Sequence, residues 1–176
     1  MTRKIAIYGG SFNPPTNGHK EVIQRLPHFE EVLLVPSYKH AWGKKVISFH
    51  QRVEMLKLFV KDLNIDNIKV SLIEESIFTS HNNFVTTYDV LSTLQKHYVN
   101  DNLTFVIGPD NFKNFNKFYK HTNILEKWSI LVVPEIIKIR STLLRKKINE
   151  RKSIDGLTTN NVLKYIKSNK LFEAIK

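Results

Sequence analysis

The sequence predicts an α/β fold in which a mostly parallel sheet of about five strands is flanked by helices. Short apolar, β-prone runs recur along the chain, at residues 4–8, 32–36, 68–72, 103–107 and 129–134. Segments with helical apolar spacing lie between them, at residues 48–62 and 86–98 for example. Strands that alternate with helices favour βαβ units, and such units build parallel sheets.

Length and composition bound the class of protein. At 176 residues the chain is expected to form one domain, residues 1–176. It has no cysteine, which excludes disulfides and thiolate metal sites and fits a cytoplasmic protein. There is no run of about 18 apolar residues, and residues 2–4 (TRK) lead straight into the first strand. We therefore expect neither a membrane span nor a signal segment.

The chain is basic, with a net charge of +11 from 27 Lys and Arg against 16 Asp and Glu. A basic surface suits nucleic acid, and it equally suits an enzyme that handles ATP and a mononucleotide. The basic residues are spread along the chain without an RNA- or DNA-binding motif, so nucleic acid is not expected as a partner. A homo-oligomer is left open.

A turn rich in glycine and proline, residues 9–19, connects the first strand to the next helix. Glycine lets a backbone approach a ligand closely, and the free N–H groups at a helix start favour phosphate. The end of the turn places the Thr16 hydroxyl three residues before the His19 imidazole. An ordinary strand–turn–helix corner would explain a glycine pair alone, but not this ending.

Residues 10–14 (GSFNP) and 16–19 (TNGH) resemble the signature of the nucleotidylyltransferase superfamily, (His/Thr)-x-Gly-His after a Gly-x-Phe-x-Pro turn. The resemblance implies a Rossmann-like sandwich and a reaction in which a substrate phosphate attacks the α-phosphorus of ATP. His19 and Thr16 would donate to phosphate oxygens. The remaining ATP contacts that it implies in this turn are Gly9, Gly10, Ser11, Phe12 and Gly18, with Asn13 on the mononucleotide side.

The loop of residues 36–45 leaves the second strand and is polar and basic. It is either a solvated loop or part of a ligand site, because α/β sheets bind ligands at the carboxyl ends of their strands. It is similar to the loop with a lysine pair in pyridine-nucleotide adenylyltransferases. That similarity makes Lys44 and Lys45 candidates for the mononucleotide phosphate, and Trp42 a packing residue or an aromatic lid.

The helix after this loop has a start signal of its own. Ser48 and Gln51 form a capping box. Arg52 follows directly, and it either supports the loop and the substrate, as the resemblance implies, or lies on the surface.

A later helix is predicted from about Thr86 to Tyr98. Residues 86–91 (TTYDVL) resemble the segment of nicotinate-nucleotide adenylyltransferases that meets the pyridine substituent. This makes Thr86 and Thr87 mononucleotide candidates. An N-cap threonine without a binding role is the alternative.

Residues 103–110 form an apolar strand that runs into Gly108-Pro109-Asp110 at its carboxyl end. This is the expected ligand position of an open parallel sheet. The segment is similar to the family's Ile-Gly-x-Asp pattern, which implies that Gly108 and Asp110 hold the adenosine. Phe118 stands where many members have Trp and would stack on the pyridine. We expect Phe112 and Phe115 to be core residues.

A third phosphate-binding pattern follows the last strand, at residues 139–145 (IRSTLLR). A helix start with hydroxyls and a guanidinium one turn in provides N–H, O–H and charged donors together. The segment is similar to the superfamily's Ile-Ser-Ser-Thr-x-Ile-Arg motif. Ser141, Thr142 and Arg145 would bind the β- and γ-phosphates. Arg140 replaces the usual first serine, and the sequence gives it no role.

Taken together, the resemblance implies an adenylyltransferase that joins ATP to nicotinate or nicotinamide mononucleotide and releases pyrophosphate, in NAD biosynthesis. Mg²⁺ would enter with the ATP phosphates, since no dedicated carboxylate site is expected. His19, Thr16 and Arg145 would be the catalytic residues. A phosphopantetheine adenylyltransferase, which shares the threonine at position 16, stays open as an alternative. So does a non-catalytic basic protein that binds nucleotides or RNA.

Overall fold

The computed structural model describes residues 2–39, 46–81 and 84–173. Five strands form one parallel sheet in the order β3-β2-β1-β4-β5. Their bounds are β1 Lys4–Gly10, β2 Glu31–Pro36, β3 Ile68–Val70, β4 Asn102–Ile107 and β5 Ser129–Val132. The predicted Rossmann-like α/β sandwich is therefore confirmed, and within the described part of the chain every strand pair is parallel.

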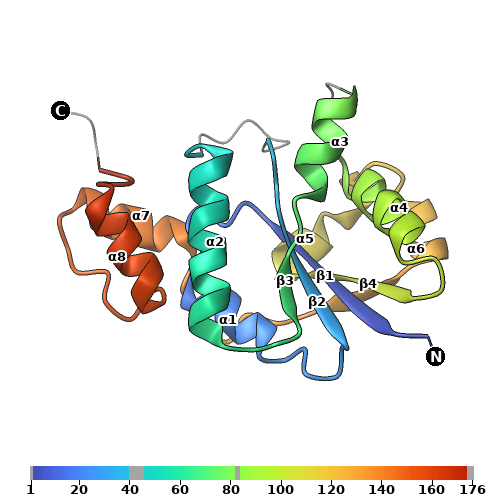
Figure 1. Ribbon diagram of the computed structural model, residues 1–176, viewed down its shortest axis with the longest axis horizontal. Coiled ribbons are helices and arrows are strands. Elements are labelled where there is room, and N and C mark those ends of the chain that lie inside the picture. The colour runs from blue at the N-terminus through green and yellow to red at the C-terminus, as the bar shows by residue number, and fades with distance from the viewer. Residues whose placement is uncertain (1, 40–45, 82–83, 174–176) are drawn as a thin grey trace.

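Helices cover both faces of this sheet (Figure 1). They are α1 Asn17–Ile23, α2 Phe49–Leu63, α3 Ile73–His81, α4 Thr87–His97, α5 Pro109–Lys113, α6 His121–Lys127, α7 Ser141–Asn149 and α8 Asn160–Ser168, with a 3-10 turn η1 at Phe115–Lys117. Helices α1, α2, α7 and α8 lie on one side, and α3, α4 and α6 on the other. None of the helices in the described residues is long and apolar enough to cross a bilayer.

Each face of the sheet has its own apolar core. On β1 the side chain of Ala6 joins the core under α1, α2, α7 and α8, whereas Ile5 and Ile7 join the core under α3, α4 and α6. Successive side chains of a strand point to opposite faces, so a strand buried on both faces must be apolar throughout. This explains why the runs of residues 4–8 and 32–36 read as continuous apolar segments.

Local capping signals place the starts of α2 and α4. Ser48 caps α2, where its hydroxyl accepts the Gln51 N–H at 3.2 Å, as the sequence predicts. Thr86 caps α4 in a reciprocal box with Asp89. Helix α3 is not among the helices predicted from the sequence.

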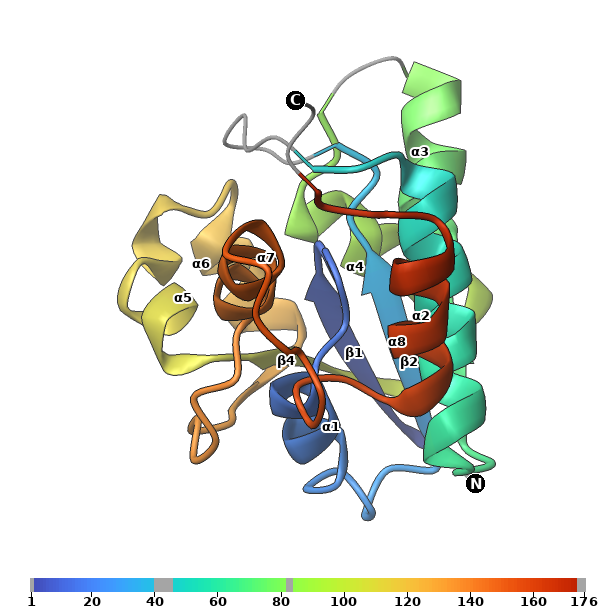
Figure 2. The same cartoon turned by 90° about the vertical axis from the view of Figure 1, so that its left-hand side faces the viewer.

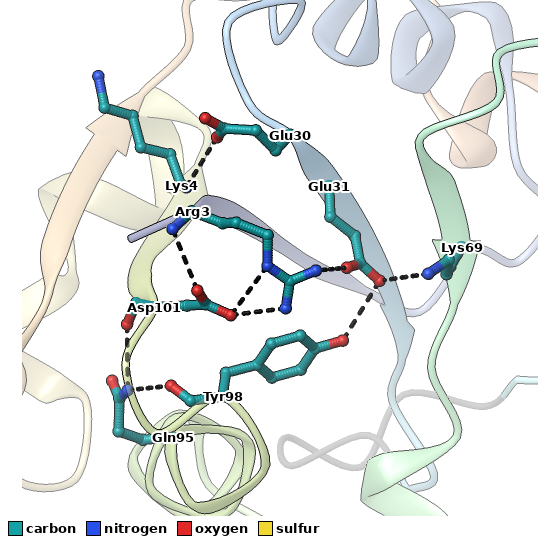
Figure 3. Close-up of polar contacts among 8 residues, drawn as sticks. All are labelled: Arg3, Lys4, Glu30, Glu31, Lys69, Gln95, Tyr98 and Asp101. Carbon is teal, nitrogen blue, oxygen red and sulfur yellow. Dashed lines mark hydrogen bonds and ion pairs between the residues drawn. The ribbon is translucent and has the colours of Figure 1, made fainter. Parts of the chain in front are cut away.

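A polar network connects the strands at the amino edge of the sheet, where the parallel strands begin (Figure 3). Glu31 at the start of β2 is buried, and its carboxylate pairs with Arg3 at 3.5 Å and Lys69 at 3.0 Å. The Tyr98 hydroxyl donates to it at 3.3 Å, and Arg3 pairs in turn with Asp101 at 2.6 Å. These contacts fix β1, β2, β3 and the end of α4 far from the carboxyl edge.

Candidate active site

The candidate site lies where β1 and β4 end side by side. Residue Tyr8 of β1 is paired with Val106 of β4, so Gly10 and Gly108 leave the sheet at the same edge. The strand order turns back between β1 and β4, and α/β sheets bind ligands at that point. Figure 2 shows β1 and β2 pointing towards this edge, with α7 to their left and α2 to their right in that view.

His19 sits in the first turn of α1, and its protonation state follows from its contacts. The Thr16 backbone N–H donates to Nδ1 of His19 at 3.0 Å, so Nδ1 must be the unprotonated nitrogen. The ring proton is therefore on Nε2. Burial beside Tyr8 and Phe12, whose ring centroids lie 6.2 and 5.1 Å away, lowers the pKa of His19 to about 4. At neutral pH His19 is an uncharged N–H donor.

The hydroxyl of Thr16 has a different role from the predicted one. Thr16 is fully buried, and its hydroxyl donates to the carbonyl of Ile139 at 2.8 Å. That proton is committed within the protein, so in this geometry Thr16 positions His19 and does not donate to a phosphate. The prediction of Thr16 as a direct phosphate donor is corrected accordingly.

Three further contacts join the N-terminal turn to the segment of residues 139–145. A Cβ on Gly18 would lie 2.4 Å from the Ile139 carbonyl oxygen, so only glycine fits this close approach. The Ser141 hydroxyl donates to the Pro14 carbonyl at 2.7 Å, and Arg145 Nη1 donates to the Asn13 carbonyl at 2.6 Å. The first and third sequence motifs thus form one structural unit.

Two residues of the turn are less accessible than predicted. Phe12 is buried and has a positive φ of 45°, so only its backbone can meet a ligand. Asn13 is also buried, and its side-chain carbonyl accepts the Ile47 N–H at 3.4 Å. The Asn13 side chain therefore holds the turn, and the predicted contact of Asn13 with the mononucleotide stays a prediction. Gly9 belongs to the end of β1 and not to the turn, whereas Ser11 directly follows the strand; their predicted contacts with ATP stay predictions.

Helix α7 begins at the same edge. Its first residues, Ser141 and Thr142, are half-buried and exposed, and Arg145 lies one turn later. Burial lowers the pKa of Arg145, which nevertheless stays charged because a guanidinium ordinarily titrates far above neutral pH. N–H groups, hydroxyls and a cation therefore gather beside His19, and this arrangement can bind phosphate.

Arg140 connects the third motif to the second. Its Nη2 lies 2.7 Å from Asp110 Oδ2 and 2.6 Å from Glu135 Oε2. These two carboxylates raise the pKa of Arg140, Glu135 most strongly. The sequence gave Arg140 no role, and here it holds the Asp110 carboxylate at the mouth of the site.

Gly108 and Asp110 are open to solvent at the end of β4. A Cβ on Gly108 would meet no atom of the described residues within 4 Å, and the side chain of Asp110 is 65% exposed. Packing in this described part of the chain therefore does not require a glycine here. A ligand that approaches the backbone closely would account for it.

Thr86 and Thr87, the mononucleotide candidates, lie at the start of α4. The Thr86 backbone N–H and hydroxyl both donate to Asp89, at 2.9 and 2.6 Å. Thr86 is therefore an N-cap, and the contacts of Thr86 and Thr87 with the mononucleotide stay predictions. Phe118 is half-buried, with its ring 5.1 Å from that of Phe115.

The phenylalanines that precede Phe118 were both expected in the core. Phe115 is buried, which confirms that prediction, but Phe112 is 45% exposed. The prediction was wrong for Phe112 because α5 is a short helix of five residues on the surface. The ring of Phe112 stacks on that of Phe115, with the ring centroids 6.1 Å apart.

Three predicted residues, Trp42, Lys44 and Lys45, lie outside the described residues. Next to them, Arg52 is fully buried and not on the surface. It donates to three backbone carbonyls, those of Ser11 at 2.9 Å, Tyr38 at 3.1 Å and Ile47 at 3.2 Å. This confirms its support of the loop; a contact with substrate stays a prediction.

Sequence reasoning missed Glu74 of α3, whose carboxylate accepts the Tyr38 backbone N–H at 2.8 Å. It was missed together with its helix. The spacing of Ile73 and Ile77 is a helical signal that could have revealed α3, but β-branched residues and Ser76 weaken the helical pattern.

Comparisons with known proteins agree with this geometry. The family model described as cytidylyltransferase-like matches residues 7–155, so the chain belongs to the cytidylyltransferase-like family. Among curated relatives, nicotinate-nucleotide adenylyltransferase of Bacillus subtilis is 30% identical over 98% of this chain and 100% of its own length. A protein of Acholeplasma laidlawii with the same name, marked as probable, is 29% identical over 98% and 99%.

Solved structures give the same result. A Vibrio parahaemolyticus protein, provisionally named nicotinate-nucleotide adenylyltransferase, is 37% identical over 99% of this chain and 98% of its own, with a TM-score of 0.88. The Plasmodium falciparum nicotinic acid mononucleotide adenylyltransferase in complex with NaAD is 22% identical over 97% of both chains, with a TM-score of 0.74. The second likeness concerns the fold alone.

Proposed function

We propose that this protein is a nicotinate-nucleotide adenylyltransferase, which joins ATP to nicotinate mononucleotide in NAD biosynthesis. The observation that carries the proposal is the meeting of three segments at the ends of β1 and β4. His19 lies on α1, Arg145 on α7 and Asp110 directly after β4, and the first two segments are hydrogen-bonded to each other. The names and full-length similarity of the relatives support the choice of substrates.

In this reaction an oxygen of the mononucleotide phosphate attacks the α-phosphorus of ATP. A new P–O–P link forms as the bond to the β-phosphate oxygen breaks, and pyrophosphate leaves. Such a step needs positioning and stabilisation of charge on the phosphoryl oxygens. Neutral His19 donates its Nε2 proton to an α- or β-phosphate oxygen. Thr142 and Arg145 bind the β- and γ-phosphates, and Ser141 joins them through its backbone N–H, because its hydroxyl donates to the Pro14 carbonyl. Pyrophosphate leaves along this surface.

The two nucleosides occupy opposite sides of this centre. The open backbone at Gly108 and the exposed carboxylate of Asp110 receive the ATP ribose, whose hydroxyls can donate to the carboxylate. Thr87 and Phe118 face the pyridine, Thr87 through hydrogen bonds and Phe118 through its ring. Lys44, Lys45 and Trp42 remain predicted contacts of the mononucleotide.

We propose that Mg²⁺ binds as part of the ATP substrate. Among residues 2–39, 46–81 and 84–173, no group of three or more His, Cys, Asp or Glu could hold a metal ion. Mg²⁺ binds phosphate oxygens readily and keeps several waters, so it can enter as the complex with ATP. When bound, it neutralises charge on the phosphates, while the protein's donors orient them.

The test is pyrophosphate release from ATP and Mg²⁺ with three separate acceptors: nicotinate mononucleotide, nicotinamide mononucleotide and phosphopantetheine. We expect turnover with nicotinate mononucleotide. Comparison with the rate for nicotinamide mononucleotide shows which of the two is the preferred substrate. Turnover with phosphopantetheine alone would assign the protein to coenzyme A synthesis. Silence with all three acceptors would favour a non-catalytic nucleotide-binding protein.

The histidine is tested in the same assay. His19→Ala is expected to lower kcat by about 10²-fold or more, the scale of losing one transition-state donor. His28→Ala is the matched control, because His28 is exposed and follows α1 at its far end. Near-normal turnover of His19→Ala would show that the proposed mechanism is wrong.

A further inference from the structure

The carboxyl end of β2 is held by charged side chains that the proposed chemistry does not use. The Ser37 N–H donates to the Gly10 carbonyl at 2.9 Å, so the chain leaving β2 stays hydrogen-bonded to the end of β1. The next residue, Tyr38, is half-buried and lies between α2 and α3. It is thus attached to the turn that leads to His19.

Side chains from two helices hold Tyr38 at its backbone and at its ring. Its N–H donates to Glu74 Oε2 of α3 at 2.8 Å, and its carbonyl accepts from Arg52 Nη2 of α2 at 3.1 Å. Its ring lies 4.9 Å from that of Phe49 and 4.7 Å from that of Phe78. Each helix therefore contributes one charged group and one aromatic ring.

Glu74 also acts on Arg52 itself. Arg52 is fully buried, and burial lowers its pKa while the charge of Glu74 raises it. Burial in turn raises the pKa of Glu74 to about 7, against the opposing effects of the Tyr38 N–H and of Arg52. A carboxylate in such a place is costly unless it is hydrogen-bonded and paired with a cation. Here the Tyr38 N–H supplies the hydrogen bond, and the charge of Arg52 favours the carboxylate.

We propose that Glu74 is a positioning residue for the mononucleotide side of the site. It fixes the backbone N–H of Tyr38 directly. The carbonyl of the same residue accepts from Arg52, which also donates to the Ser11 carbonyl in the signature turn. Glu74 thereby sets where the chain leaves β2 relative to β1. The exit of β2 lies across β1 from β4, the strand assigned to the adenosine. Loss of the Glu74 side chain therefore weakens mononucleotide binding more than ATP binding.

The anchoring is tested first, without any turnover. Glu74→Ala removes the acceptor, whereas Glu74→Gln keeps the length and an amide oxygen that can accept the same N–H. Amide exchange of Tyr38, followed by NMR in the ligand-free protein, is expected to accelerate about tenfold or more in Glu74→Ala and far less in Glu74→Gln. Glu75→Ala is the matched control, with the same charge change on the same helix.

The consequence for binding is measured by steady-state kinetics, and this arm rests on the proposed function. In Glu74→Ala the KM for nicotinate mononucleotide is expected to rise about tenfold, with the KM for ATP and kcat within about twofold. Glu74→Gln recovers most of the loss, and Glu75→Ala behaves as wild type. General damage to the fold would instead move both KM values and kcat together.

Each result decides something. Unchanged Tyr38 exchange in Glu74→Ala overturns the anchoring, and faster exchange with an unchanged mononucleotide KM overturns the positioning role. If wild-type protein has no turnover with either pyridine mononucleotide, the proposed function falls and takes the substrate arm with it, while the exchange measurement still decides whether Glu74 anchors Tyr38. Should Glu74→Ala fail to fold, Glu74→Gln gives the same comparison at smaller amplitude.

Discussion

The glycine in the histidine motif gives the sharpest test of how the site is assembled. Gly18 lies in the first turn of α1, where a Cβ would come within 2.4 Å of the Ile139 carbonyl oxygen. Ordinary contacts begin at 3.4 Å, so about 1 Å must be gained by moving backbone against backbone. The same carbonyl accepts the Thr16 hydroxyl, so Gly18→Ala strains the contact that orients His19.

The expected magnitude follows from these contacts. Overpacking costs about 1–3 kcal/mol, and loss of the Thr16 hydrogen bond costs about 1 kcal/mol more. Alanine favours a helix over glycine by up to about 1 kcal/mol, which offsets part of this. The net loss in the free energy of unfolding is about 1–3 kcal/mol, or roughly 2–12 °C in Tm for a chain of this size. A displacement near 1 Å at His19 would lower kcat by about 10²-fold.

Urea unfolding and pyrophosphate release measure the two effects, and Gly108→Ala is the matched control. It adds the same methyl group where no atom of the described residues lies within 4 Å, so only the smaller N-cap preference for glycine at the start of α5 should affect its stability. Its KM for ATP should rise if the ribose approaches that backbone. A Gly18→Ala protein that is more stable than wild type, with normal turnover, would refute the reasoning, because helix propensity alone would then govern the position.

Other predictions concern the network in Figure 3, the titration of His19 and the Arg140 bridge. Glu31→Ala should lower the free energy of unfolding by about 1–3 kcal/mol, since it removes a buried acceptor. Glu54→Ala, which removes a surface ion pair with Lys57, should change it by less than about 0.5 kcal/mol. Equal effects of the two variants in urea unfolding would contradict this. By NMR, His19 in the ligand-free protein should titrate with a midpoint of about 4, and a midpoint near 6.5 would mean that its ring is solvated. Since that pKa is lower in the folded state, His19 should lower stability as pH falls from about 6.5 to 4, by up to about 3 kcal/mol, and His19→Ala should remove this slope. Arg140→Ala should leave the free energy of unfolding within about 0.5 kcal/mol of wild type, because the side chains of Arg140 and Asp110 are more than half exposed; a larger loss in urea unfolding would show that the bridge holds the fold.

Much of the fold was accessible from local patterns. The runs of residues 4–8 and 103–107 are short, apolar and β-prone, and each became a strand. Ser48 and Thr86 were identified as helix starts because a cap uses only a side chain and backbone groups within one turn. Local patterns did not predict helix α3, because its β-branched and hydroxyl residues weaken the helical pattern.

The candidate site was predictable as far as its motifs are contiguous. His19, Gly108 and Arg145 could each be selected from a few neighbouring residues, because phosphate binding needs donors clustered at a helix start or strand end. What the motifs do not contain is the partner of each group. The hydroxyl of Thr16 could serve a phosphate or the protein, and the sequence has no means of choosing between them.

By itself, then, the sequence predicted the five strands, several of the helices between them, the edge of the sheet at which the site lies, and the residue types available there. Only the tertiary structure decided how those residues are used. Thr16 is bonded to Ile139, Arg52 is buried against the carbonyls of Ser11 and Tyr38, and Arg140 holds Asp110. Each of these contacts joins residues far apart in the chain. Local propensity acts over one or two turns, whereas the choice of a hydrogen-bond partner depends on which segments the packing brings together.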